Sequence, residues 1–222
     1  MTIRPILFSA PMVRALLDGR KTMTRRVLKP QPARPAFGDG YWYDAGAPAR
    51  DIMEGEPEIT RFAPGDLLWV RETFSGVHEY EREKWPPSAW FAGDPLWYWA
   101  DGNPADGDWT KPKPGIHMPR WASRLTLAVT AVRVERLQDI SEADAIAEGI
   151  ARSPHGNGDQ WCSYPLGTSA AGWLDPRESY RELWNSINGA GAWDANPWVA
   201  VISFDVHRAN VDTLSAQPED QR

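Results

Sequence analysis

The chain passes from a helix to a strand within the stretch Leu17-Asp18-Gly19-Arg20-Lys21-Thr22-Met23-Thr24-Arg25-Arg26. Apolar residues repeat at helical spacing between positions 12 and 17, and Gly19 is the expected C-terminal stop of that helix. Residues 23–27 follow in an extended pattern, and alternation predicts that Thr24 and Arg26 share one face of this strand. The stretch therefore predicts a helix, a tight turn and a strand in direct succession.

Reactive and basic side chains are concentrated in the same stretch. A lysine, two threonines and three arginines lie within seven consecutive positions. A lysine three residues before a threonine, as in Lys21 and Thr24, is a candidate base and nucleophile pair. Arg20 and Arg26 beside them suit a ligand that bears oxygens or phosphate. Taken alone, Lys21 is better explained as a cation that closes a helix, and Thr24 is equally well explained as a β-branched strand residue.

Apolar alternation and helix start signals predict the remaining elements. The five predicted strands cover residues 3–8, 23–27, 67–73, 125–137 and 198–204. Helices are predicted after Pro11, after a capping box formed by Ser141 and Asp144, and after Asp175. Long segments rich in proline, glycine and small polar residues separate these elements near residues 29–62, 76–118 and 151–175.

This order of elements predicts an α+β fold. We expect a small mixed or antiparallel β-barrel with two or three flanking helices, and with the long segments as loop insertions. Residues 1–208 are predicted to form a single domain. The composition of residues 209–222 is typical of a disordered tail.

Composition is that of a soluble globular protein. The chain has 222 residues, of which 42% are hydrophobic and 24% charged. It contains no apolar run long enough to predict a membrane span, and its N-terminus lacks the apolar segment of a signal peptide. Cys162 is the only cysteine, which excludes an internal disulfide and a cysteine zinc site. We therefore expect a cytoplasmic protein.

No metal or other cofactor is predicted. The four histidines, at positions 78, 117, 155 and 207, are far apart and show no helical pairing. The glycine-rich segment Gly189-Ala190-Gly191 lacks the strand and helix context of a phosphate-binding loop.

Positive charge is local in an otherwise acidic chain. The net charge is −6, but residues 1–34 hold eight lysines or arginines and one acid, so they carry +7 and the remaining residues −13. Non-specific binding along a nucleic acid usually needs a basic surface. The distribution favours a pocket for a small anionic or polar ligand over a long nucleic-acid track.

Several motifs together resemble those of the ASCH domain, a relative of the PUA RNA-binding fold. The first is Gly19-Arg20-Lys21-Thr22-Met23-Thr24-Arg25, and the second is Pro64-Gly65-Asp66-Leu67-Leu68-Trp69-Val70. The third is Leu137-Gln138-Asp139-Ile140-Ser141-Glu142, which leads to Ala147-Glu148-Gly149. The predicted helix around Tyr180 and the last strand complete a match over residues 3–204, and the insertions resemble those of longer, phage-associated members. The resemblance implies that the expected barrel is of the PUA-like type.

The resemblance also implies an activity. The small bacterial members most similar to this core include amidohydrolases that remove the acetyl group from N4-acetylcytidine. By resemblance, their catalytic lysine falls on Lys21, their nucleophilic threonine on Thr24 and their catalytic glutamate on Glu148. Amide hydrolysis needs such a base, nucleophile and acid. The substrate that this activity implies is a modified nucleoside or nucleotide. Two other functions stay open for the protein: a non-catalytic module that binds RNA or a modified nucleotide, and a ribonuclease.

Four further residues are candidates for substrate binding. Arg26 is expected either to contact the ligand or to form an ion pair with Glu72, which is predicted to lie on a strand beside Arg71. Glu72 is a candidate to hold Lys21 or Arg26, and a plain surface pair is the alternative. Trp69 suits stacking on a pyrimidine, although core packing is the commoner use of tryptophan. His117 is a candidate for the pocket mouth, with a hydrogen-bonded structural role as the alternative.

Overall fold

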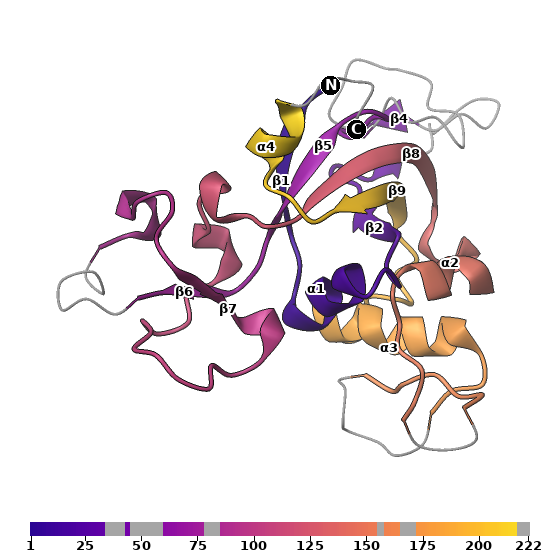
Figure 1. The fold of residues 1–222 in the computed structure, drawn as a ribbon. Coiled ribbons are helices and arrows are strands. Elements are labelled where there is room, and N and C mark those ends of the chain that lie inside the picture. Colours follow the sequence, from indigo (N-terminus) through magenta and orange to yellow (C-terminus); the bar gives the residue numbers. More distant parts are fainter. Residues whose placement is uncertain (34–42, 45–59, 78–84, 155–157, 165–171, 217–222) are drawn as a thin grey trace. The chain divides into compact units, whose positions relative to one another are not determined.

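The computed structural model describes residues 1–33, 43–44, 60–77, 85–154, 158–164 and 172–216 (Figure 1). Most of the predicted insertion at 29–62 therefore lies outside the described residues, as do parts of those at 76–118 and 151–175. The chain divides into two compact units. Unit 1 comprises residues 1–19, 65–129 and 205–222, and unit 2 comprises residues 20–64 and 130–204. A single domain over residues 1–208 stays a prediction.

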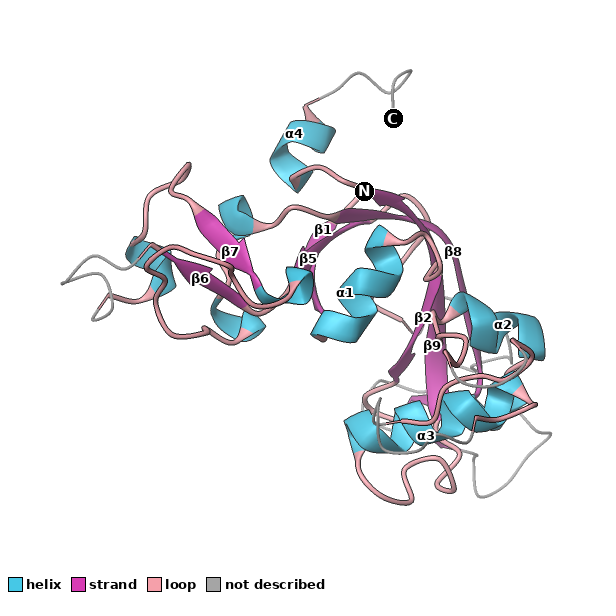
Figure 2. Cartoon of the chain, turned by 60° about the horizontal axis from the view of Figure 1, so that its bottom comes forward, coloured by secondary structure: helices cyan, strands magenta, loops and turns pink. Residues whose placement is uncertain are grey.

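Five strands form one mixed sheet with the order β1-β5-β8-β9-β2 (Figure 2). Their bounds are β1 Ile3–Leu7, β2 Met23–Val27, β5 Leu67–Arg71, β8 Thr126–Arg136 and β9 Trp198–His207. β1 and β5 are parallel, whereas β5 pairs with β8 and β2 with β9 in antiparallel fashion. All five predicted strands and the α+β class are confirmed.

The predicted closure of these strands into a barrel is not confirmed. A barrel requires its two end strands to be hydrogen-bonded to each other. Among the described residues β1 pairs with β5 and β2 pairs with β9, so β1 and β2 remain the two ends of an open order.

In unit 1, α1 (Ala10–Leu17) follows β1 as predicted. Pro11 lies in its first turn, and its apolar stripe, which includes Val13 and Leu16, is buried. The chain leaves the helix through Gly19, whose φ of 72° lies in the left-handed region that glycine adopts without strain. The predicted helix stop at Gly19 is thereby confirmed.

The aromatic segment of unit 1 has a regular core. β6 (Phe74–Gly76) pairs with β7 (Leu96–Tyr98), and short 3-10 helices cover Pro87–Ala89, Trp99–Asp101, Gly115–His117 and Arg120–Ala122. Phe74 and Trp90 meet edge to face, with ring centroids 5.7 Å apart, and Met118 is buried beside them. Trp90 is thus a packing residue, which is the commoner interpretation of tryptophan in this segment.

Part of the segment that is predicted to be a disordered tail, residues 209–222, is helical. Residues 211–215 form the helix α4 (Val211–Ser215), which Asn210 caps by accepting a hydrogen bond from the Asp212 main-chain N–H. Val211 and Leu214 are buried against Leu67 of β5. Composition missed this helix because two well-placed apolar side chains are enough to dock one and a half turns onto an existing core. Residues 217–222 lie outside the described part of the chain.

In unit 2, two helices and two short strands accompany the sheet residues. The helices are α2 (Glu142–Ala147) and α3 (Pro176–Asn188), and the short strands β3 (Pro32–Ala33) and β4 (Tyr43–Asp44) pair with each other. A 3-10 helix at Leu137–Asp139 leads from β8 toward α2. Ser141 Oγ accepts a hydrogen bond from the Asp144 N–H at 3.1 Å, so the predicted N-cap is confirmed. α2 packs against both α3 and β2.

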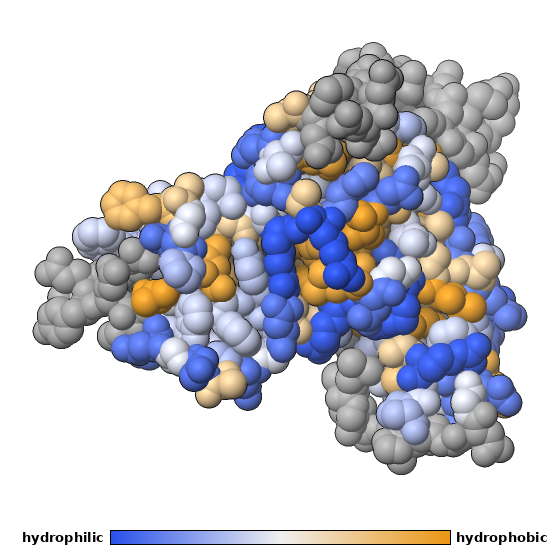
Figure 3. All heavy atoms as spheres, in the orientation of Figure 1, coloured by the Kyte–Doolittle hydropathy of each residue, from blue (hydrophilic) through white to orange (hydrophobic). Residues whose placement is uncertain are grey.

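The surface view shows no large continuous apolar area. Hydrophilic side chains cover most of the described atoms in this orientation, and apolar side chains appear in separate areas between them (Figure 3). No helix within the described ranges combines the length and the apolar character needed to cross a bilayer.

Candidate active site

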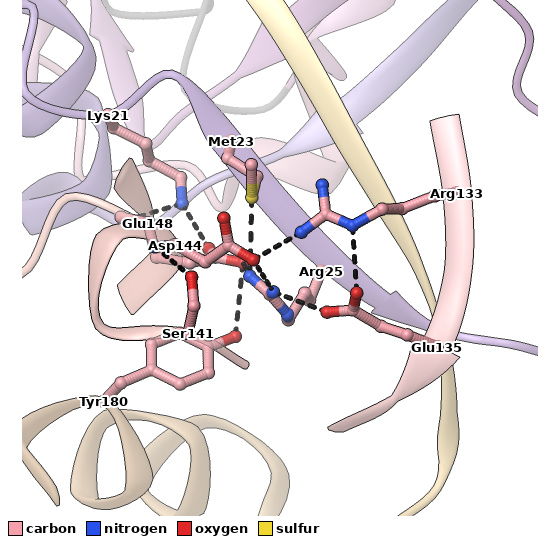
Figure 4. A network of polar contacts seen from close by, with 9 residues as sticks. All are labelled: Lys21, Met23, Arg25, Arg133, Glu135, Ser141, Asp144, Glu148 and Tyr180. Carbon is pink, nitrogen blue, oxygen red and sulfur yellow. Dashed lines mark hydrogen bonds and ion pairs between the residues drawn. The ribbon is translucent and has the colours of Figure 1, made fainter. Parts of the chain in front are cut away.

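Lys21 and Glu148 meet in unit 2. Lys21 Nζ donates hydrogen bonds to Glu148 Oε2 at 2.8 Å and to the Glu148 main-chain oxygen at 2.7 Å (Figure 4). Their side chains are only 2% and 4% exposed. A lysine and a glutamate that lie 127 positions apart in the chain therefore form one buried ion pair.

Main-chain contacts hold this pair in register. Lys21 and Glu148 form an antiparallel bridge, and the Thr22 N–H donates to the Ala147 oxygen at 2.9 Å. Glu148 is the C-cap of α2, and Gly149 follows it with a φ of 88°, a conformation that favours glycine. Arg20 Nη1 donates to the Gly149 oxygen at 2.9 Å. Arg20 thus fastens the turn that carries Glu148.

Arg25 links the same glutamate to two further carboxylates. Its Nη1 lies 3.3 Å from Glu148 Oε1, and its Nη2 lies 2.6 Å from Glu135 Oε1 and 2.8 Å from Asp144 Oδ2. Arg133, which is 40% exposed, contacts Glu135 and Asp144 from the outer side (Figure 4). The buried Arg25 guanidinium therefore connects β2, β8 and α2 through charge-assisted hydrogen bonds.

Tyr180 of α3 supplies the remaining contact to the carboxylate. Its hydroxyl donates to Glu148 Oε1 at 3.3 Å. Its ring lies 6.1 Å from the ring of Trp184 and 6.2 Å from that of Trp193, measured between centroids. Burial raises the pKa of Tyr180 well above its usual value, and the Glu148 charge raises it further, so the phenol stays a donor.

Electrostatics perturb the cations of the site in opposite directions. Burial lowers the pKa of Lys21, and the charge and hydrogen bond of Glu148 only partly oppose this effect. The charges of Arg26 and Arg25 lower the pKa of Lys21 further. Burial also lowers the pKa of Arg25, but nearby carboxylates, Glu148 first, raise it by more. Arg25 therefore stays a cation, whereas the Lys21 amine gives up its proton more easily than an ordinary lysine.

Thr24 lies on β2 and is buried, opposite Ile202 of β9 in the strand pairing. Alternation along β2 places it on the face opposite Arg25, whose side chain points to Glu148. Among the described residues its hydroxyl has no hydrogen-bond partner. The structure thus joins Lys21 and Glu148, and the pairing of Thr24 with the Lys21 amine stays a prediction.

Arg26 shares its strand face with Thr24, as alternation predicts. It borders a cavity of about 410 Å³ together with Lys29 and Arg61. Arg26 therefore borders a space in which a ligand could contact it, as one of its two predicted roles requires.

Trp69 belongs to unit 1. It is buried in β5 and packs with Val211 and Leu214, and the guanidinium of Arg71 lies 4.6 Å from the centre of its ring. These contacts are those of the core-packing alternative. Its predicted role in substrate binding is not supported by any contact of unit 1.

Glu72 and His117 also belong to unit 1. Glu72 is buried, and its two carboxylate oxygens accept hydrogen bonds from Arg124 Nε and Nη2 at 2.9 and 3.0 Å. The expected arginine partner is present, but it is Arg124, which also contacts Asp101 and lies over the ring of Tyr98. His117 is exposed at the end of a 3-10 helix. The roles of both residues in substrate binding stay predictions.

Four charged or polar contributors escaped the sequence analysis: Arg25, Glu135, Asp144 and Tyr180. Alternation places Arg25 on the same face of β2 as the apolar Met23 and Val27, which is a signal that a partner must exist. The identity of the partners is not visible in the sequence, because they come from three elements that are distant in the chain.

No protein-family model, curated protein or solved structure matches the chain. Function is therefore inferred from the site itself and from the resemblance of its motifs. Within the described residues, no group of three or more histidine, cysteine, aspartate or glutamate side chains is arranged to hold a metal ion.

Proposed function

We propose that this protein is an amidohydrolase that removes the acyl group from N4-acylated cytosine nucleosides of the N4-acetylcytidine type. The observation that carries the proposal is the buried contact of 2.8 Å between Lys21 Nζ and Glu148 Oε2. Two residues that motif resemblance independently identifies as base and acid come together there. Buried groups of opposite charge with a shifted pKa are typical of acid–base sites, although structural ion pairs share this feature.

The chemistry uses a short proton relay. Thr24 Oγ1 attacks the acyl carbonyl carbon and passes its proton to neutral Lys21 Nζ. Lys21 hands a proton to Glu148 across their hydrogen bond, and Glu148 protonates N4 as the bond between the acyl carbon and N4 breaks. Cytidine leaves, and the acyl ester remains on Thr24. Water then attacks the ester carbon, a proton of this water passes by way of Lys21 to Thr24 Oγ1 as the ester C–O bond breaks, and the carboxylic acid is released.

The surroundings of Glu148 suit this role. Tyr180 and Arg25 both contact Oε1, which leaves Oε2 directed to Lys21. Three donors from three elements thus fix the orientation of one carboxylate, and such preorganisation lowers the cost of proton transfer in the reaction.

The test is an assay of the purified protein with N4-acetylcytidine. We expect release of cytidine and acetate, and quenched reactions are expected to carry the acetyl group on the peptide that contains Thr24. Thr22→Val is the matched control, because Thr22 is exposed and its hydroxyl is not part of the relay. Full activity in both Lys21→Ala and Thr24→Ala would exclude the mechanism. Binding without turnover that persists in Thr24→Ala would identify a binding module, and Lys21-dependent strand cleavage a ribonuclease.

The activity is expected to rise with pH. Lys21 must be neutral to accept a proton, and burial lowers its pKa from the ordinary value of 10.5. The kcat/KM profile should therefore increase through an ionisation below that value and then level off. The same pKa shift of Lys21 also affects stability. At pH values between the pKa of Lys21 in the folded chain and its higher pKa in the unfolded chain, the unfolded chain binds more protons. The free energy of unfolding therefore rises with pH over this range.

The control for the pH profile is Lys21→Met, which fills the same space without a titrating amine. We expect this variant to lose the rise in unfolding free energy in chemical denaturation at several pH values. A wild-type kcat/KM that stays level from neutral to alkaline pH would contradict the assignment of Lys21 as the base.

A further inference from the structure

A cavity of about 410 Å³ in unit 2 has a strongly one-sided charge. Eight residues line it, of which Arg26, Lys29 and Arg61 are basic and none is acidic. The chain as a whole carries a net charge of −6, so this lining departs from the average. A concave space whose charged lining residues are all cations attracts a small anion.

The cavity is built from well-packed parts. Arg26 lies opposite Ala200 in the pairing of β2 with β9, and the small alanine side chain leaves room beside the arginine. Phe62, which is 5% exposed, also lines the cavity. Thr60 Oγ1 donates to the Phe62 oxygen at 2.7 Å and accepts from its N–H at 3.2 Å, and the guanidinium of Arg61 lies 5.1 Å from the Phe62 ring centre. These contacts hold the turn that carries Arg61 and place its guanidinium over the Phe62 ring.

The cations repel one another in this space. Burial lowers the pKa of Arg26, and the charge of Arg61 lowers it further, against the opposing effect of Glu148 and Tyr180. A phosphate monoester carries about −1.5 to −2 charges at neutral pH, and the arginine fork matches its oxygens. An anion of this kind would relieve the repulsion.

The position of the cavity relates it to Thr24. Thr24 and Arg26 share one face of β2 and are two residues apart, which corresponds to about 7 Å along a strand. Thr24 itself does not line the cavity, so a ligand whose phosphate contacts Arg26 would have to extend along the strand to reach the Thr24 hydroxyl. We propose that the Arg26–Lys29–Arg61 cavity binds the phosphate monoester of an acylated cytidine nucleotide, so that the nucleotide is the preferred substrate. This inference rests on the proposed function.

The test compares the KM for N4-acetylcytidine with that for its 5′-monophosphate. In the wild type we expect a KM about tenfold lower for the monophosphate, which corresponds to one charge-assisted hydrogen bond. Arg61→Ala should remove this preference and leave the KM for the nucleoside and kcat unchanged. Arg177→Ala is the matched control, because Arg177 is exposed on α3 and pairs with Asp175 outside the cavity. Equal KM values for the two substrates in the wild type would overturn the inference.

Calorimetry with cytidine and cytidine 5′-monophosphate separates this inference from the proposed function, because it needs no turnover. Tighter, Arg61-dependent binding of the monophosphate supports the cavity even if no deacylation occurs. Deacylation with no preference for the monophosphate would contradict the proposed role of the cavity and support the proposed enzymatic function. A short RNA without terminal phosphate that binds as tightly, with the same dependence on Arg61, would show a phosphodiester site and contradict the inference.

Discussion

Glu148→Gln is expected to reduce the turnover of N4-acetylcytidine by on the order of a thousandfold, the range typical for loss of a general acid. Glutamine keeps the shape of the side chain and can still accept a hydrogen bond from Lys21, but it has no proton to exchange with the leaving nitrogen. Because Arg25 retains Glu135 and Asp144 as partners, the fold is expected to survive the change. Steady-state kinetics, with circular dichroism to check folding, measure the effect.

Glu142→Gln is the matched control for this experiment. Glu142 lies in the first turn of the same helix and is exposed, so its replacement should leave turnover unchanged. A folded Glu148→Gln variant that retains wild-type turnover would show that the buried pair with Lys21 is structural and that the acid is another group.

Arg25→Ala is expected to lower the free energy of unfolding by about 3–5 kcal/mol, as breaking a buried ion pair from one side does. The guanidinium contacts Glu135, Asp144 and Glu148, and its removal takes away the buried cation that joins these three carboxylates. Urea denaturation measures the change. Arg25→Lys should fall between alanine and wild type, because a single ammonium cannot reproduce the contacts of the arginine fork.

Arg133→Ala is the control for Arg25. Arg133 contacts two of the same carboxylates, but its side chain is 40% exposed, and exposed pairs contribute at most about 1 kcal/mol. Similar, small losses in both variants would contradict the view that Arg25 is the centre of the network.

The five main strands could be predicted because each carries a local pattern. β8 alternates apolar and polar residues over part of its length, and β9 begins with an apolar run over residues 198–202. The N-cap at Ser141 and the stop at Gly19 also follow from local chemistry. Strand order is different in kind: the parallel pairing of β1 with β5 depends on contacts between segments about sixty residues apart, which periodicity does not record. The barrel is an extrapolation from strand number and from resemblance, and the strand pairings do not confirm it.

The residues of the site could be predicted where they belong to the motifs that resemble those of the ASCH domain. Lys21 and Glu148 were placed together by resemblance, and the structure brings their side chains into contact. Arg25 was assigned to the opposite face from Thr24, yet its three carboxylate partners could not be named. Which acids converge on a buried guanidinium is decided by tertiary packing of β8, α2 and β2. The same limit explains Glu72, whose partner proved to be Arg124.

The double contact between the Lys21 amine and residue 148 bears on the working lifetime of an enzyme of the proposed kind. An amine next to a threonine ester is a rival nucleophile, and migration of the acyl group from oxygen to nitrogen would leave a stable amide and a dead catalyst. Because the main-chain oxygen and Oε2 of Glu148 hold Nζ at 2.7 and 2.8 Å, the nitrogen can exchange protons without travelling to the ester carbon. In an enzyme of this kind, the two hydrogen bonds that position the lysine would also keep its amine away from the ester carbon.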